Sequence, residues 1–150
     1  GDLERQGETR QSSDPKDRAE AAAHMIKFIN DLSTYGKERD PGFLIVSQNA
    51  VELLDYDEKE IYMNSIDGLG IESLWYWETE EREPKEINER LDYIRRFFKA
   101  GKFVVVTDYV DDGSQSKANL ARIKLFINNC KKEGYNYFIG NEDRALDVLK

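Results

Sequence analysis

Four carboxyl side chains follow short apolar segments of the chain, where a chemical site could form. They are Glu72, Asp108, Asp111 and Asp112. Cleavage of a glycosidic bond uses two carboxyl groups, one protonated as the acid and one ionised. Each residue also has a structural alternative. Glu72 suits the first turn of a helix, Asp111 and Asp112 precede a glycine as in a turn, and Asp108 at the mouth of an apolar strand needs a hydrogen-bonding partner or a function.

Amide and aromatic side chains follow the same apolar segments. They are Gln48, Asn49, Trp75, Trp77 and Tyr109. Sugar rings present C–H faces that pack on Trp and Tyr, and hydroxyl groups that bond to Asn, Gln and Asp. The combination favours carbohydrate binding. The structural alternatives are that the two amides simply end a strand and that the tryptophans pack in a core.

Other chemistries find little support in the chain. His24 is the only histidine and lies upstream of the strand ends, which excludes a Ser-His-Asp triad. Cys130 is the only cysteine, so neither a disulfide within the chain nor a cysteine-rich metal site is expected. No zinc-ligand spacing occurs, and the aspartates near residue 110 lack the loop pattern of a calcium motif. We therefore expect neither a metal nor another cofactor.

The amino-acid composition limits the classes of partner that the chain is expected to bind. The 150 residues include 22 Lys and Arg against 30 Asp and Glu, for a net charge of −8. This acidic balance argues against nucleic acid and against an anionic membrane as partners. No run approaches the ~20 apolar residues of a membrane span, and no segment of the sequence has the pattern expected of a signal peptide. The length suits one domain but falls short of the about 250 residues of an eight-stranded barrel.

The elements that would position these residues alternate along the chain. Apolar periodicity predicts helices over 15–36, 85–100, 116–133 and 142–149, with short helical stretches in 50–63. Apolar runs predict strands at 43–46, 66–70, 103–107 and 135–139. Single strands alternating with helices predict a parallel α/β sheet. Ligands bind at the carboxyl ends of such strands, here called the rim, so the candidate residues would share it.

The spacing of the predicted strands fits two architectures. It agrees with the about 31 residues per unit of a (β/α)8 barrel, and it also fits an open, doubly wound sheet. No glycine-rich phosphate-binding motif follows a strand, which lowers the case for a nucleotide-binding sheet. We interpret residues 1–18 as a polar leader or loop and residues 19–150 as the domain.

Four segments of residues 19–150 together resemble one known family. They are FLIVSQNAVELL, YMNSIDGLGIESLWYW, KFVVVTDYVDDGS and GYNYFIGNEDRALDVL. They are similar to the C-terminal half of the glycoside hydrolase family 114 domain, a (β/α)8 barrel described as an endo-α-1,4-polygalactosaminidase. The resemblance implies that the four strands are barrel strands five to eight. It also implies an extracellular enzyme acting on a polysaccharide or oligosaccharide.

The resemblance assigns roles to individual rim residues. Glu72 matches the catalytic glutamate of the family, Asp108 and Tyr109 match its strand-seven rim residues, and Gln48 with Asn49 matches its strand-five pair. We also expect Trp75 to stack on a sugar ring. The second catalytic acid of the family, an aspartate after strand four, would lie before the first residue, so we expect the chain to be a fragment of a longer hydrolase.

Two other interpretations remain open. The chain could be a non-catalytic carbohydrate-binding module whose half-barrel pairs as a homodimer to complete an eight-stranded ring. It could also be a small doubly wound domain that binds an unrelated ligand, with helices on both faces of its sheet.

Overall fold

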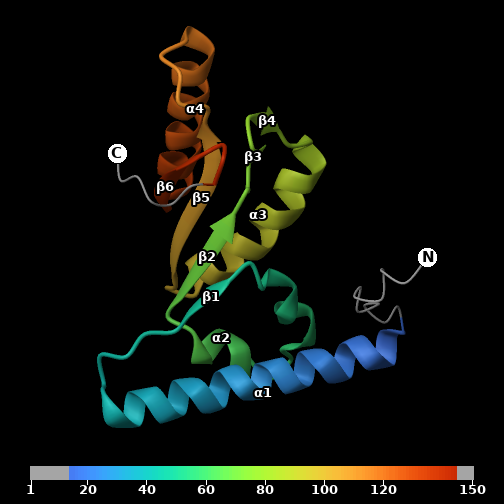
Figure 1. Ribbon diagram of the computed structural model, residues 1–150. Coiled ribbons are helices and arrows are strands. Elements are labelled where there is room, and N and C mark those ends of the chain that lie inside the picture. The colour runs from blue at the N-terminus through green and yellow to red at the C-terminus, as the bar shows by residue number, and fades with distance from the viewer. Residues whose placement is uncertain (1–13, 145–150) are drawn as a thin grey trace, which may run out of the picture.

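The computed structural model describes residues 14–144, which form an α/β fold around a four-stranded sheet (Figure 1). The elements in chain order are α1 (Pro15–Arg39), β1 (Val46–Gln48), the 3-10 helix η1 (Val51–Tyr56), α2 (Ile61–Ser65), β2 (Gly68–Glu72), β3 (Tyr76–Trp77), β4 (Glu80–Glu81), α3 (Pro84–Lys99), β5 (Phe103–Asp111), α4 (Lys117–Glu133) and β6 (Asn136–Asn141). The sheet has the order β1-β2-β5-β6, and all of its strands are parallel. The predicted parallel α/β class is confirmed.

The first helix is longer than its sequence pattern predicted. The Asp14 side chain caps its start by accepting a hydrogen bond from the Lys16 amide at 2.9 Å, so the helix begins at residue 15 as its periodicity predicted, and residues 15–18 do not belong to the leader assigned to 1–18. The predicted end at Gly36 is wrong. Gly36 stays helical, and its missing side chain leaves room for the ring of Phe43. The helix ends before Asp40, because the following Pro41 disfavours helical geometry at that residue.

The strands end later than predicted, and this changes the site. The ladder between β1 and β2 starts only at Val46, and β2 and β5 continue through Glu72 and Asp111. Residues expected in loops are therefore strand residues, whose side chains alternate between the two faces. The predicted last helix, 142–149, lies mostly outside the described residues, and residues 142–144 are not helical.

One face of the sheet forms the core with the helices. Its buried side chains alternate along the strands and are Leu69, Ile71, Val104 and Val106. They share one cluster with Ile94 and Phe97 of α3 and with Phe126 and Cys130 of α4. The buried ring of Tyr62 in α2 meets Phe97 edge-on, with centroids 5.8 Å apart.

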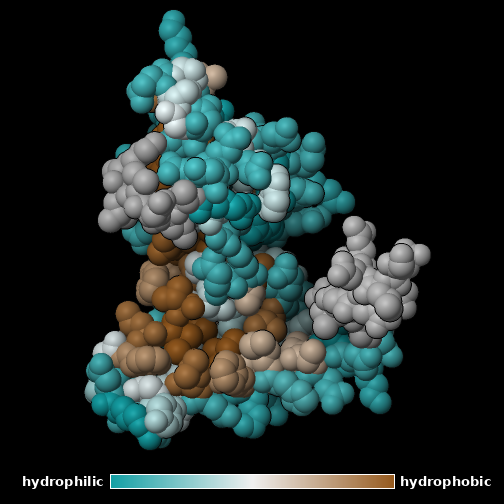
Figure 2. All heavy atoms as spheres, viewed as in Figure 1, coloured by the Kyte–Doolittle hydropathy of each residue, from teal (hydrophilic) through white to brown (hydrophobic). Residues whose placement is uncertain are grey.

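Within residues 14–144, the opposite face remains open along much of its length. Its side chains are partly or largely exposed at Val46, Gln48, Phe103, Val105 and Thr107. Figure 2 shows hydrophobic residues gathered over β1 and the lower sheet, above α1, whereas the upper part around the β3–β4 hairpin is hydrophilic. Among the described residues, no helix combines the length and apolarity needed to cross a membrane.

The β3–β4 hairpin was not predicted. Tyr76 pairs with Glu81 and Trp77 with Glu80, which leaves Glu78 and Thr79 as a two-residue turn. Glu78 takes a left-handed conformation with φ 55°, where hairpins usually carry Asn or Gly. Without that signal, the charged residues of this segment suggest only a solvent-exposed surface.

The packing of α3 gives a direct test of the core. Phe97 is fully buried, whereas its neighbour Phe98 is 44% exposed. Replacing Phe97 by alanine leaves a cavity, so we expect Phe97→Ala to lower the free energy of unfolding by about 3–5 kcal/mol. The matched variant Phe98→Ala should cost about 1 kcal/mol or less. Urea denaturation measures both, and equal losses would contradict the packing.

Candidate functional site

Glu72 is the centre of the rim. It ends β2, and its carboxylate is held by residues from the two neighbouring strands. The Tyr109 hydroxyl on β5 donates to Glu72 Oε1 at 2.6 Å, and Asn49 Nδ2, directly after β1, donates to Oε2 at 3.3 Å. Both carboxylate oxygens therefore accept a hydrogen bond, which fixes the orientation of the carboxyl group.

Asn49 is itself held firmly. The backbone amide of Asn49 donates to the Gly70 carbonyl at 2.9 Å, and its side-chain Oδ1 accepts from the backbone amide of Glu72 at 2.8 Å. Its backbone is left-handed with φ 56°, a conformation that asparagine tolerates better than most residues. Asn49 thus binds both the main chain and the side chain of Glu72.

Gln48 completes this group on the open face of the sheet. It lies opposite Gly70 in the ladder, and its side chain occupies the space that a Cβ at Gly70 would fill. The predicted rim residues Gln48, Asn49, Glu72 and Tyr109 are therefore brought together.

Hydrogen bonding sets the charge of Glu72. The Tyr109 hydroxyl is the largest influence and holds the pKa of Glu72 below its usual range, helped by Asn49, Gln48 and the positive charge of Arg144, while partial burial opposes them. The same contact raises the pKa of Tyr109. Glu72 is thus ionised near neutral pH, as a base or nucleophile must be, and is not poised to donate a proton.

Asp108 lies elsewhere than expected. It points to the helix-covered face, is 0% exposed, and accepts hydrogen bonds from the backbone amides of Leu74, Trp75 and Tyr76 at 2.7, 2.9 and 3.0 Å. Burial raises the pKa of Asp108, against these three bonds and the charge of Arg90. A carboxylate enclosed in this way fixes the loop after Glu72, and it does not reach a ligand on the open face.

The two tryptophans differ in their exposure to solvent. Trp75 is almost wholly buried and packs edge-on against Phe126 of α4, with centroids 6.1 Å apart. Trp77, in the hairpin, is 53% exposed. The expectation that Trp75 stacks on a sugar does not fit its burial, and Trp77 is the tryptophan that solvent reaches.

Arg144 was missed by the sequence reasoning. Its guanidinium lies 4.5 Å from the ring centre of Tyr109 and 5.2 Å from that of Trp77, within the range of cation–π attraction. It follows β6 in a left-handed turn, and no motif marks it.

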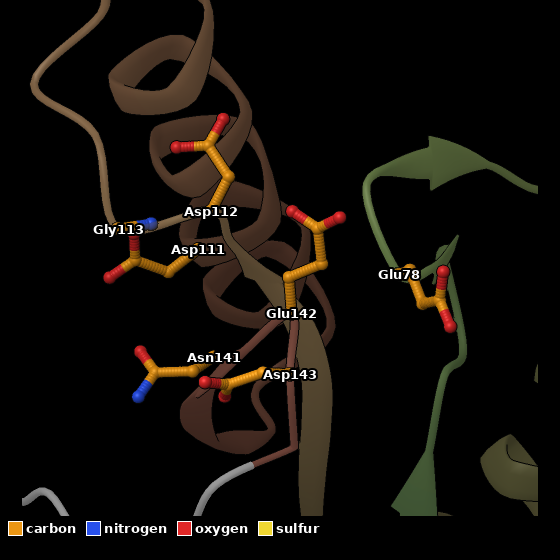
Figure 3. A pocket seen from close by; sticks show the side chains of 7 residues that line it. All are labelled: Glu78, Asp111, Asp112, Gly113, Asn141, Glu142 and Asp143. Carbon is orange, nitrogen blue, oxygen red and sulfur yellow. Dashed lines mark hydrogen bonds between the residues drawn. The ribbon is translucent and has the colours of Figure 1, made fainter.

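An acidic hollow of about 400 Å³ lies farther along the same rim (Figure 3). Glu78 approaches it from the hairpin, and the other lining residues come from the ends of β5 and β6. Asp111 accepts from the Gly113 amide and from Asn119 Nδ2, and Asp112 pairs with Arg122 at 3.1 Å. These contacts agree with the turn alternative for the two aspartates. Within residues 14–144, no group of acidic, histidine or cysteine side chains is arranged to hold a metal ion.

The contact between Tyr109 and Glu72 can be tested by titration. Removing the hydroxyl in Tyr109→Phe should raise the pKa of Glu72 toward the ordinary value of about 4.3. The lowered pKa stabilises the wild-type fold above that pH, and this stabilisation is lost as the pH falls through the folded-state pKa. The difference in unfolding midpoint between the wild-type protein and Tyr109→Phe should therefore become smaller at acidic pH. NMR titration of [5-13C]glutamate measures the pKa, with Tyr35→Phe on α1 as control. An unchanged pKa in Tyr109→Phe would contradict the contact.

Comparison with known proteins gives relatives without an assigned activity. No family model matches the chain. The uncharacterized protein MJ1477 of Methanocaldococcus jannaschii is 40% identical over 129 residues, which are 85% of this chain and 37% of that protein. An uncharacterized protein of Thermotoga maritima is 36% identical over 132 residues, which are 88% of this chain and 41% of that protein. The chain thus spans 37% and 41% of the lengths of these two curated relatives.

Proposed function

We propose that this chain supplies the ionised carboxylate and part of the sugar-binding rim of a glycoside hydrolase. The proposed substrate is an amino-sugar polysaccharide such as α-1,4-linked polygalactosamine. The observation that carries the proposal is the geometry of Glu72, whose two oxygens are oriented by Tyr109 and Asn49 on the open side of the sheet. The resemblance to glycoside hydrolase family 114 supports the choice of reaction and substrate.

In this proposal Glu72 acts as the base or nucleophile, and the acid comes from a second carboxyl group. Tyr109 and Asn49 orient the Glu72 carboxylate and keep it ionised until it takes a proton from water, as a base, or bonds to the sugar carbon, as a nucleophile. In this proposal Gln48 binds sugar hydroxyls, and the exposed part of the Trp77 ring, which also lies 5.2 Å from Arg144 and 5.4 Å from Arg82, packs against a sugar face. The acidic hollow beside the rim would attract protonated amino groups. The proposed location is extracellular, on the resemblance alone.

The proposal includes completion of the sheet to an eight-stranded barrel by four further β/α units. Three observations on residues 14–144 support it: the open face of the sheet, its edges at β1 and β6 with no further strand paired in this part of the chain, and an apolar stripe on α1 that these residues leave uncovered. The stripe consists of Met25, Phe28, Leu32 and Tyr35, each at least 41% exposed and three or four residues from the next. This spacing places them on one side of the helix. The greater length of both relatives leaves room for the remaining units.

Catalysis by Glu72 is tested by hydrolysis of the polymer with the complete natural polypeptide that carries this chain. Glu72→Gln keeps the shape of the side chain but loses the charge, so we expect kcat to fall by about 100-fold or more. Glu89→Gln, an exposed glutamate on α3, is the matched control and should keep the wild-type rate. A full rate in Glu72→Gln would remove Glu72 from the mechanism. Binding without turnover, with a dimer by light scattering, would favour the homodimeric binding module instead.

Barrel completion is tested on the α1 stripe in the same polypeptide. If further β/α units cover Phe28, the variant Phe28→Glu buries an unpaired charge and should lower the free energy of unfolding by about 3 kcal/mol. Thr34→Glu, at an exposed position on a different side of the same helix, should change it by about 0.5 kcal/mol or less. Chemical denaturation measures both. Equal, small effects would show that nothing covers the stripe and would contradict barrel completion.

A further inference from the structure

We infer that Arg90 and Asp108 are positioning residues for Glu72, because they form hydrogen bonds to opposite sides of the turn of residues 72–76. The inference rests on the proposed function in one respect, that Glu72 is the reacting carboxylate. Neither side chain was assigned this role from the sequence, and neither needs to touch a substrate to exercise it.

Arg90 grips the carbonyl groups of the turn. It projects from α3, and its two terminal nitrogens donate to successive carbonyls, Nη2 to Glu72 O at 3.0 Å and Nη1 to Ser73 O at 2.5 Å. Arg82 Nε adds a second donor to Ser73 O at 2.7 Å. A guanidinium can bridge two acceptors with fixed geometry, which a lysine ammonium cannot reproduce.

Asp108 grips the amide groups of the same turn. Its two oxygens accept from the three consecutive amides of residues 74–76, and the Ser73 amide bonds to the Thr107 carbonyl at 2.9 Å. Ser73 has φ 51°, a left-handed conformation that persists in a non-glycine residue when its surroundings impose it. The turn is therefore held in a conformation that it would not adopt alone.

The opposite charges of Arg90 and Asp108 stabilise each other. Arg90 is partly buried, and burial lowers its pKa while the charge of Asp108 raises it. The pair places a positive charge on the carbonyl side of the turn and a negative charge on its amide side. Loss of either charge would leave the other in a poorly hydrated place with half of the turn unbound.

The conformation of the turn matters for catalysis because the Glu72 carboxylate must accept hydrogen bonds from two donors at once. The Tyr109 hydroxyl and Asn49 Nδ2 reach Glu72 at 2.6 and 3.3 Å, and Tyr109 directly follows Asp108 on β5. Rotation of the backbone at residues 72 and 73 would move the carboxylate away from both donors. Misplacement by about 1 Å is enough to cost a catalytic group about 100-fold in rate.

The test compares Arg90→Lys with Arg96→Lys, an exposed arginine on the same helix, in the complete natural polypeptide. Arg90→Lys keeps the charge but cannot bridge both carbonyls. We expect the pKa of Glu72, followed by NMR titration of [5-13C]glutamate, to rise toward that of the Tyr109→Phe variant. We also expect kcat on the polymer to fall by about 100-fold with KM little changed. Arg96→Lys should alter neither quantity.

The inference is overturned if Arg90→Lys matches Arg96→Lys in both the pKa of Glu72 and kcat, even where its thermal midpoint is lower. Should Arg90→Lys fail to fold, Arg82→Lys removes only one donor from Ser73 O, and the same two readouts decide. If the wild-type protein hydrolyses no glycan, the proposed function fails. The titration then still decides whether Arg90 positions the Glu72 carboxylate.

Discussion

The site depends on the parallel register of β1, β2 and β5. Gln48 lies beside Gly70, and Glu72 lies beside Thr107. With this register, the carboxyl ends of three strands place Asn49, Glu72 and Tyr109 within hydrogen-bonding distance. A slip of one residue would turn every side chain of a strand to the other face. Glu72 would then enter the core, and Asp108 would leave the amides that it binds.

Two glycines in β2 make that register compatible with the site. Gly68 and Gly70 lie on the open face, where a Cβ would collide with the ring of Phe103 and with the Gln48 amide. Their absent side chains let these neighbours lie across β2, and Gln48 can thereby act on the Glu72 carboxylate. Gly70, which weakens the apolar pattern of this strand, is thus the residue that admits the rim side chain of Gln48, whereas Gly68 admits Phe103 at the start of β5.

Much of the architecture was predictable because it follows periodicity and end signals. The apolar stripe of α3, the stop at Gly134 after α4 and the alternation of helices with strands all lie in the local sequence. The assignment of faces at the rim was not predictable. Whether Asp108 or Tyr109 faces the open side of the sheet depends on where β5 ends, and a run such as FVVVTDYVD gives no stop signal. The positions of Trp75 and Trp77 likewise depend on a hairpin whose Glu-Thr turn lacks the residues that usually mark one.

The arrangement of helices bears on the competing interpretations. A doubly wound sheet would carry helices on both faces, whereas α3 and α4 pack against the same face among the described residues. The open face has Glu72 at its rim with an ionised carboxylate. Asp108 has a raised pKa, as an acid would need, but it faces the core and its oxygens bind three amides. If Glu72 cleaves a glycosidic bond, the proton donor must therefore approach from the open side of the sheet, and Asp108 cannot fill that role.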